Sequence, residues 1–230
     1  MRPVVLGTRG RELHWPAAAR ADAGGKYPLH LAASAGADKE ALSVVLEAHP
    51  DAAAKADAGD KLPLALALAS RASDDAAMVL VAAAPDAIGS DGRTPLHLVI
   101  AAKRPEELWQ RVLEAHSAAA STADANGKLP LALALANRAS YDAAMVLVVA
   151  APDAVGSDGR MPLHLMIAAK RPEELWKRVL EAHTAAAATA DADDKYPYEL
   201  YPSGASDDAT ALLLTACIAA SGEGVLWRLL

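Results

Sequence analysis

Apolar residues recur along this chain as pairs of short runs separated by polar turns. In residues 95–116 the first run opens with a proline and covers about two helical turns, since the fixed φ of proline suits the start of a helix. The second run places Leu108, Trp109, Val112 and Leu113 at helical spacing on one face. Acidic residues precede this run and a histidine ends it, as the helix dipole favours. The pattern predicts two short antiparallel helices.

A second form of the pattern alternates with the first. The run Leu64–Ala69 has a period of two and is open to interpretation as a strand, but both of its faces are apolar. Its leading proline and its Ala and Leu content favour a buried helix. The next helix of this form is predicted to begin after a capping serine, Ser73 or Ser140, and to end before Pro85 or Pro152.

The prolines that open the first runs mark a regular repeat. Their separations are 35, 32, 35, 32 and 35 residues. They are Pro28, Pro63, Pro95, Pro130, Pro162 and Pro197. A fixed period in this range indicates an array of supersecondary units. We expect six units in residues 25–221, starting near 26, 61, 93, 128, 160 and 195, between a partial unit at 1–24 and a partial connector at 222–230.

Two units together repeat every 67 residues, and one such pair is written twice. The first copy is Lys61–His116 and the second copy is Lys128–His183. They differ at seven positions, which are Ser70/Asn137, Asp74/Tyr141, Ala82/Val149, Ile88/Val155, Thr94/Met161, Val99/Met166 and Gln110/Lys177. A recent tandem duplication explains this identity. Length varies only in the connectors, long at 51–60 and short at 86–92, as expected for surface loops.

Composition narrows the class of protein. The chain has 230 residues, is 53% apolar and carries a net charge of −7, which disfavours a nucleic-acid partner because phosphates need a basic face. No apolar stretch approaches the roughly 20 residues that span a bilayer. The single cysteine, Cys217, forms no intramolecular disulfide and is expected to be buried and inert. We expect the cytoplasm or another reducing intracellular compartment, with an organelle lumen left open.

Candidate chemistry is sparse. His30, His97 and His164 recur in alternate units, too far apart to share a metal ion, so structural roles are expected and no metal or cofactor is predicted. The acidic pair Glu106 and Glu107 looks like a helix start rather than a general acid and base. The chain has no serine elbow and no glycine-rich phosphate loop, so catalysis is not expected. Trp109 and its copy Trp176 are interpreted as packing between units, with an exposed anchor as the alternative.

These residues resemble the ankyrin repeat. Thr94-Pro-Leu-His97 matches the signature of that family in full, and the segments Tyr27–His30 and Met161–His164 lack only the threonine. The other units replace the histidine with Ala65, Ala132 or Glu199. The resemblance covers roughly residues 22–219. It implies an all-α solenoid of helix-turn-helix units with short hairpin or irregular connectors, because no unit buries its apolar side alone.

The function implied by the resemblance is non-catalytic binding of another protein. The tips of the connectors would form a mixed-charge row along one edge, near the first-helix positions of a groove, and Tyr141 would add an aromatic contact. The expected partner-binding residues are Asp60, Lys61, Asp91, Arg93, Val99, Asn126, Lys128, Tyr141, Asp158, Arg160, Met166 and Lys195. The alternative is an accessory subunit of a larger assembly that docks through apolar ends such as Val225–Leu230. An enzyme is a third class, supported only by scattered His and Glu.

Overall fold

The described part of the chain is entirely helical. The computed structural model describes residues 19–201 and 207–221, and no β-strand occurs in these ranges. The all-α prediction is therefore confirmed, including the helical interpretation of Leu64–Ala69, which lies within a helix. Most of the predicted partial unit at 1–24 and the predicted connector at 222–230 lie outside the described residues.

The helices form pairs of a short first helix and a longer second helix. The pairs are α1 (Pro28–Ser34) with α2 (Lys39–Ala48), α3 (Pro63–Ala69) with α4 (Asp74–Ala83), α5 (Pro95–Ala101) with α6 (Glu106–Ala115), α7 (Pro130–Ala136) with α8 (Tyr141–Ala150), and α9 (Pro162–Ala168) with α10 (Glu173–Ala182). We number these pairs units 1 to 5. In each unit the two helices pack against each other, so the apolar runs of the sequence face inward together.

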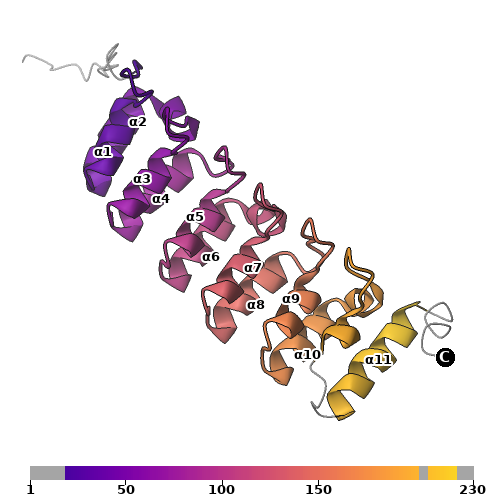
Figure 1. Ribbon diagram of the computed structural model, residues 1–230. Coiled ribbons are helices and arrows are strands. Elements are labelled where there is room, and N and C mark those ends of the chain that lie inside the picture. Colours follow the sequence, from indigo (N-terminus) through magenta and orange to yellow (C-terminus); the bar gives the residue numbers. More distant parts are fainter. Residues whose placement is uncertain (1–18, 202–206, 222–230) are drawn as a thin grey trace, which may run out of the picture.

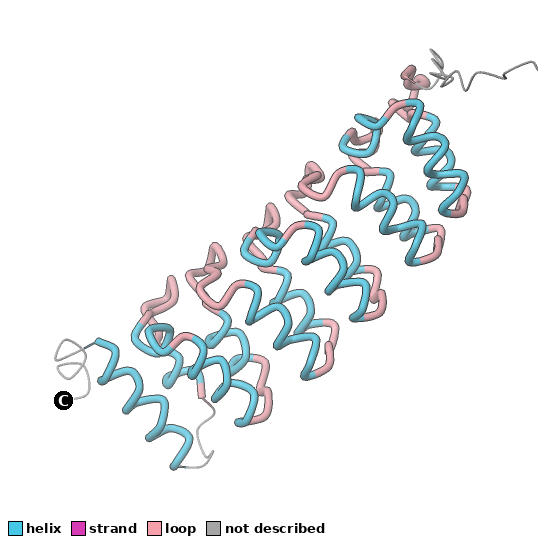
Figure 2. Tube along the Cα trace, turned by 180° about the vertical axis from the view of Figure 1, so that it is seen from behind, coloured by secondary structure: helices cyan, strands magenta, loops and turns pink. Residues whose placement is uncertain are grey.

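The units stack in a single elongated row (Figure 1). Each first helix packs against the first helix of the next unit, and each second helix packs against the next second helix. The loops that join the units project together from one side of the row, as the view from behind also shows (Figure 2). The row therefore has a layer of first helices, a layer of second helices and an edge made of connector tips.

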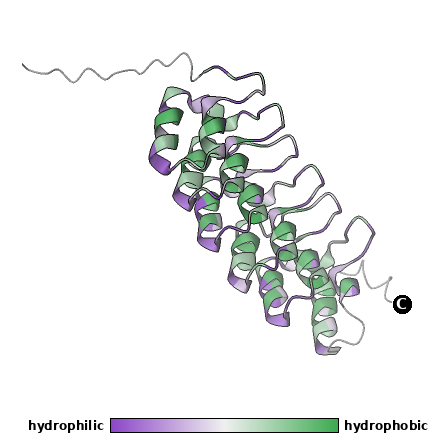
Figure 3. Ribbon diagram, turned by 60° about the vertical axis from the view of Figure 1, so that its left-hand side comes forward, coloured by the Kyte–Doolittle hydropathy of each residue, from purple (hydrophilic) through white to green (hydrophobic). Residues whose placement is uncertain are grey.

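The connectors alternate in form as the sequence does. Each long connector opens with a 3-10 helix: η1 (Pro50–Ala54), η2 (Ser117–Ser121) and η3 (Thr184–Ala188). The short connectors after α4 and α8 contain turns and extended backbone only. Most hydrophobic residues lie in the helices, and the projecting tips are mainly hydrophilic (Figure 3). The variation in repeat length is thus confined to the surface of the row.

The sixth unit departs from the others. Its first helix is reduced to the 3-10 helix η4 (Pro197–Leu200), and its second is α11 (Asp207–Ser221), a helix of 15 residues. Cys217 is fully buried on α11, as expected. Burial also raises the pKa of its thiol, which keeps the sulfur in its less reactive form.

The local sequence explains where the helices begin. Proline occupies the first turn of all five first helices, where its missing N–H has no partner to lose. Among the second helices, the side chains of Asp38, Ser73 and Ser140 accept hydrogen bonds from the third backbone N–H of α2, α4 and α8. The two predicted serine caps are therefore confirmed. In α6 and α10 a proline and two glutamates take that place.

A left-handed residue follows each first helix. It is Gly36 in unit 1, whereas units 2 to 5 place Arg71, Lys103, Arg138 and Lys170 there with φ between 51° and 61°. This conformation costs a residue with a Cβ about 1 kcal/mol relative to glycine. The cation partly offsets this strain, because it lies beside the free carbonyl groups at the end of the helix.

The core runs continuously between the two helix layers. Leu108, Trp109, Val112 and Leu113 are all buried, as their helical spacing predicts, and Trp176 is fully buried. Both tryptophans thus fit the packing interpretation rather than that of an exposed anchor. Since each unit covers the apolar face of its neighbour, most of the stability of the row resides at the boundaries between units.

Two kinds of boundary alternate along the row. At the boundaries of units 1/2 and 3/4, a polar side chain on the later unit bonds to the earlier one: Ser70 Oγ donates to Ala33 O at 2.8 Å, and Asn137 Nδ2 donates to Ile100 O at 3.1 Å. At the boundaries of units 2/3 and 4/5, an arginine reaches back to the carbonyl of an alanine. Arg104 bonds to Ala72 O, and Arg171 bonds to Ala139 O. The 67-residue period thus reflects two alternating sets of contacts.

Candidate partner-binding surface

The connector tips are rigid turns held by aspartate side chains. In the long connectors one carboxylate oxygen accepts two backbone N–H groups: Asp57 binds Gly59 and Lys61, and Asp124 binds Asn126 and Lys128. Asp191 does the same in the last connector. These aspartates are buried, with exposed fractions of 6–8%. They shape the tip, and the residues that follow them point outward.

Hydrogen bonds join neighbouring tips. Ala58 N donates to Gly24 O, and Ala125 N donates to Asp91 O, each at 2.9 Å. Two further links join tips farther along the row, from Ser157 N to Gly127 O at 3.1 Å and from Ala192 N to Asp158 O at 2.9 Å. Among the described residues these bonds join four of the five pairs of neighbouring tips, all except the tips at 57–61 and 89–93, and hold the joined tips at fixed relative positions.

Ion pairs reinforce two of these links. Arg93 Nε lies 3.6 Å from Asp91 Oδ2 on its own tip and 4.0 Å from Asp124 Oδ2 on the next. The copy is tighter, since Arg160 Nε lies 3.3 Å from Asp191 Oδ2. Both arginines are about one-third exposed, so their charge is already matched within the row.

The lowered pKa values of two buried aspartates, Asp57 and Asp191, agree with a structural role. The N–H of Lys61 is the main cause that lowers the pKa of Asp57. For Asp191, burial raises the pKa, but hydrogen bonds from Lys195 N–H, Arg160 and Asp193 N–H outweigh it, and the pKa is lowered overall. Both carboxylates are accordingly stabilised as anions at neutral pH, where they serve the turn.

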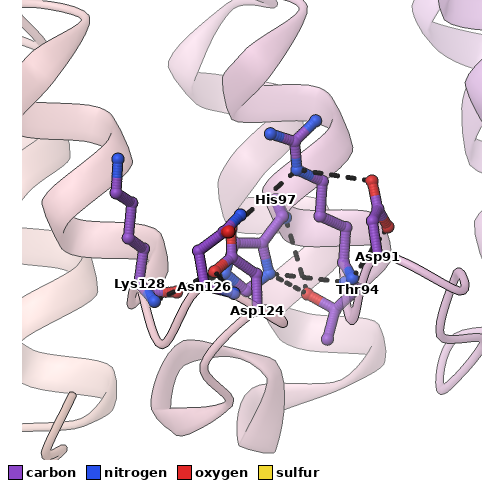
Figure 4. A network of polar contacts seen from close by, with 7 residues as sticks. Asp91, Thr94, His97, Asp124, Asn126 and Lys128 are labelled. Carbon is purple, nitrogen blue, oxygen red and sulfur yellow. Dashed lines mark hydrogen bonds and ion pairs between the residues drawn. The ribbon is translucent and has the colours of Figure 1, made fainter. Parts of the chain in front are cut away.

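The histidines beneath the tips tie first helices to connectors (Figure 4). His97 Nδ1 lies 2.9 Å from Thr94 Oγ1, and its Nε2 lies 3.0 Å from Lys128 O in the next connector. His30 Nε2 similarly lies 2.9 Å from Lys55 O. Burial lowers the pKa of His30, His97 and His164. These imidazoles are therefore neutral hydrogen-bonding groups within the structure.

Seven of the predicted binding residues lie exposed on the tips. They are Asp60, Lys61, Asp91, Asn126, Lys128, Asp158 and Lys195. Arg93 and Arg160 share this edge but are half-buried in the ion pairs described above. The three tip lysines follow the 67-residue period, and none of them forms an ion pair within the described ranges. These three ammonium groups are thus unmatched positive charges of the row.

Three predicted residues lie on helices, away from the tips. Val99 and Met166 are fully buried on α5 and α9, so the expectation that they line an exposed groove is wrong. They face the neighbouring helices because positions five residues into a first helix point into the core. Tyr141 begins α8, in the layer of second helices, and does not belong to the tip row.

Sequence reasoning missed a second group of residues near Tyr141. Met145 and Val149 follow Tyr141 at intervals of four, so the three side chains share one face of α8. With Leu113 of α6 and Arg178 of α10 they line a hollow on the layer of second helices. The signal was present in the sequence, since the two copies differ at Asp74/Tyr141 and Ala82/Val149, but each difference was considered alone.

Within residues 19–201 and 207–221, no group of three or more His, Cys, Asp or Glu side chains is arranged to hold a metal ion. No helix in the same ranges combines the length and apolar character required to cross a bilayer.

Comparison with known proteins adds no relative to this description. No protein-family model matches the sequence, and no curated protein is significantly similar to it.

Proposed function

We propose that this protein is a non-catalytic scaffold that binds another protein through the tip row. The observation that carries the proposal is the regular placement of Lys61, Lys128 and Lys195 on tips that are fixed to their neighbours by hydrogen bonds. A pre-ordered surface binds with little loss of conformational entropy. The resemblance of Thr94–His97 and its counterparts to ankyrin repeats supports the same role.

The titratable groups favour binding over catalysis. The groups with perturbed pKa values at the tips, such as His97 and Asp191, are each engaged by the backbone or by a neighbouring side chain of this chain. A catalytic acid or base has to reach a substrate instead. The exposed groups at the tips are Lys, Asp and Asn side chains in open solvent, which suit charge-complementary contacts with a partner.

The partner is expected to present acidic groups at intervals along its surface. The tip lysines lack ion-pair partners within the described ranges, whereas the arginines are matched by Asp124 and Asp191. Asp91 and Asp158 lie on the tips between the lysines, and Asp60 lies beside Lys61; these acidic residues would exclude partners with a continuous negative charge. Such alternation gives specificity rather than raw affinity.

Charge reversal tests the proposal. Affinity capture from the native source with the wild-type chain would be compared, by quantitative mass spectrometry, with capture by a variant carrying Lys61→Glu, Lys128→Glu and Lys195→Glu. The expected result is at least a tenfold loss of specific partners, about 1.4 kcal/mol. The control carries Lys39→Glu, at an exposed lysine away from the tips. Unchanged capture by the tip variant would refute binding through this row.

A truncation distinguishes this role from that of an accessory subunit docked by its end. Deleting Val225–Leu230 should leave capture through the tips intact. If the truncation removes the same partners that the tip variant retains, the accessory role replaces the one proposed here.

A further inference from the structure

The second copy carries a hollow in the layer of second helices, away from the connector tips. It has a volume of about 630 Å³ and lies among α6, α8 and α10. Leu113 of α6, which is 7% exposed, and the Tyr141, Met145 and Val149 stripe of α8 supply its apolar lining. Helices α6 and α8 pack less closely than other neighbouring second helices, which leaves room between them.

The apolar stripe is only partly covered: Tyr141 and Met145 are half-buried against the core, and Val149 lies open to solvent. Val149 is 69% exposed, the largest exposed fraction among the large hydrophobic residues of the described ranges. The corresponding stripe of the first copy is Asp74, Met78 and Ala82 on α4. Two substitutions therefore replace an acidic side chain with an aromatic one and enlarge an exposed alanine to valine, so the second copy presents more apolar surface here. Such a patch is typical of an interaction site.

The same substitutions rearrange the charges at the rim. In the first copy Arg104 pairs with Asp74 at 2.6 Å, and Arg111 pairs with Asp75 at 3.3 Å. In the second copy the guanidinium of Arg178, the counterpart of Arg111, lies 5.6 Å from the ring centre of Tyr141. This cation–π contact draws the arginine away from the aspartate that it would otherwise neutralise.

Two carboxylates at the rim are left unmatched. Asp142, the counterpart of Asp75, and Glu114 of α6 both line the hollow and are exposed. Within the described ranges neither forms an ion pair, in contrast to Asp75. The hollow therefore combines an apolar floor with a rim that carries two carboxylates, Asp142 and Glu114, and one cation, Arg178, which is held over the Tyr141 ring. The rim is thus acidic on balance, on a chain whose net charge is −7.

We propose that this hollow binds an amphipathic helix of another protein, with apolar residues at i, i+4 and i+8 and lysine or arginine beside them. The stripe from Tyr141 to Val149 extends about 12 Å along α8, which matches two turns of a partner helix. The basic residues would pair with Asp142 and Glu114. A helix suits the site better than a strand, because the described residues offer no sheet edge for strand addition.

Binding here is independent of the tip row, since the two surfaces share no residue. A second protein thus binds beside the partner of the tips, and the row acts as a bridge between them. The inference stands on the contrast between the two copies and does not require the proposed function of the tips.

Labelled synthetic peptides provide the test. The probe is a helix of about five turns with leucines at i, i+4 and i+8 flanked by lysines, and its match carries glutamates in place of the lysines. Binding is measured by fluorescence anisotropy at low and high salt. The wild-type chain should bind the lysine peptide at least tenfold more tightly than the glutamate peptide, with the difference reduced by salt. Equal binding of both peptides, or none, would overturn the proposal.

The copies supply matched variants. Tyr141→Asp with Val149→Ala restores the residues of the first copy and should weaken binding of the lysine peptide at least tenfold. Asp74→Tyr with Ala82→Val transfers the stripe to α4 and serves as the matched control, because α2 packs closely against α4 and leaves less room there, so the stoichiometry should stay at one peptide per chain. Circular dichroism checks that each variant is folded. Unchanged affinity of the Tyr141→Asp, Val149→Ala variant for the lysine peptide contradicts the proposal. A wild-type chain that dimerises with rising concentration, when this variant does not, also contradicts it, because the hollow would then bind a second copy of the chain.

Discussion

The two copies have the same four helices, displaced by 67 residues, yet their surfaces differ in kind. In the interior, Val99 is replaced by Met166 and Thr94 by Met161. Both changes put a methionine at a buried position. On the layer of second helices, Asp74 becomes Tyr141, and the ion pair with Arg104 is replaced by a half-buried aromatic ring in contact with Arg178. The comparison teaches that the fold tolerates repacking in its core, while its outer layer diverges in charge and polarity.

The difference between the two tryptophans gives the largest expected effect. Trp176 is fully buried and meets Tyr201 edge to face, with ring centres 5.7 Å apart, whereas Trp109 is 5% exposed. Trp176→Ala should cost about 4 kcal/mol of unfolding free energy and Trp109→Ala about 3 kcal/mol. Urea unfolding followed by circular dichroism measures both. Gln110→Ala, at an exposed neighbour, is the control and should change little. The reverse order would show that Tyr201 does not strengthen the packing of Trp176.

The histidines offer the next test of the comparison. His97 bonds to Thr94 Oγ1 and to Lys128 O, but in the second copy Met161 replaces the threonine and His164 Nε2 has no hydrogen-bond partner in the described ranges. We expect His97→Ala to cost about 3 kcal/mol and His164→Ala about 2 kcal/mol. Urea unfolding followed by circular dichroism measures the unfolding free energy of both variants. Thr94→Ala in the first copy should remove part of the difference, and equal losses for both histidines would contradict the assigned hydrogen bonds.

The buried imidazoles also make stability depend on pH. Burial lowers the pKa of His30, His97 and His164 below the ordinary value of 6.5, so the unfolded chain binds protons more readily than the folded chain. Stability is fully present above pH 6.5 and should fall as the pH drops from 7 to 5. Asp57 and Asp191, with lowered pKa values, lose their contribution only below about pH 4.

Thermal unfolding at several pH values measures this slope. His97→Ala should make the melting temperature less dependent on pH between 5 and 7. A slope that stays unchanged in this variant would show that His97 does not titrate differently in the folded chain.

The sequence predicts most of the fold because packing and local chemistry agree. Pro95 and its counterparts, the serine caps and the Leu108–Leu113 face each specify one helix end or face, and all are found as expected. The regular period then forces the units into line. The buried turn aspartates are harder to recognise, because residue type alone does not distinguish Asp124, which accepts backbone hydrogen bonds, from Asp60, which faces solvent.

The candidate surfaces were harder to predict. Val99 and Met166 were placed on a groove by resemblance, although an apolar residue in a two-turn helix faces either a groove or the core depending on how units are rotated. The hollow beside Tyr141 requires side chains from three units, 67 or fewer residues apart, and no periodicity within one helix reveals such proximity. The left-handed Arg71 and Lys170 were also unexpected, because glycine is the residue that favours that conformation.

Exchange of a single residue between the copies gives the smallest expected effect. Asp74→Tyr removes the ion pair with Arg104, which is 18% exposed at the side chain, and should cost about 1 kcal/mol, since the pair is partly open to solvent. Tyr141→Asp should gain less than that, about 0.5 kcal/mol, because Arg171 keeps its bond to Ala139 O and Arg178 regains an acidic neighbour. Thermal unfolding at low and high salt measures both, with Arg104→Ala in the Asp74→Tyr background as the double-mutant cycle. If Arg104 stabilises the chain equally with Asp74 and with tyrosine at position 74, the coupling free energy of the cycle is zero. The outer layers of the two copies would then differ in surface chemistry but not in the forces that join their units.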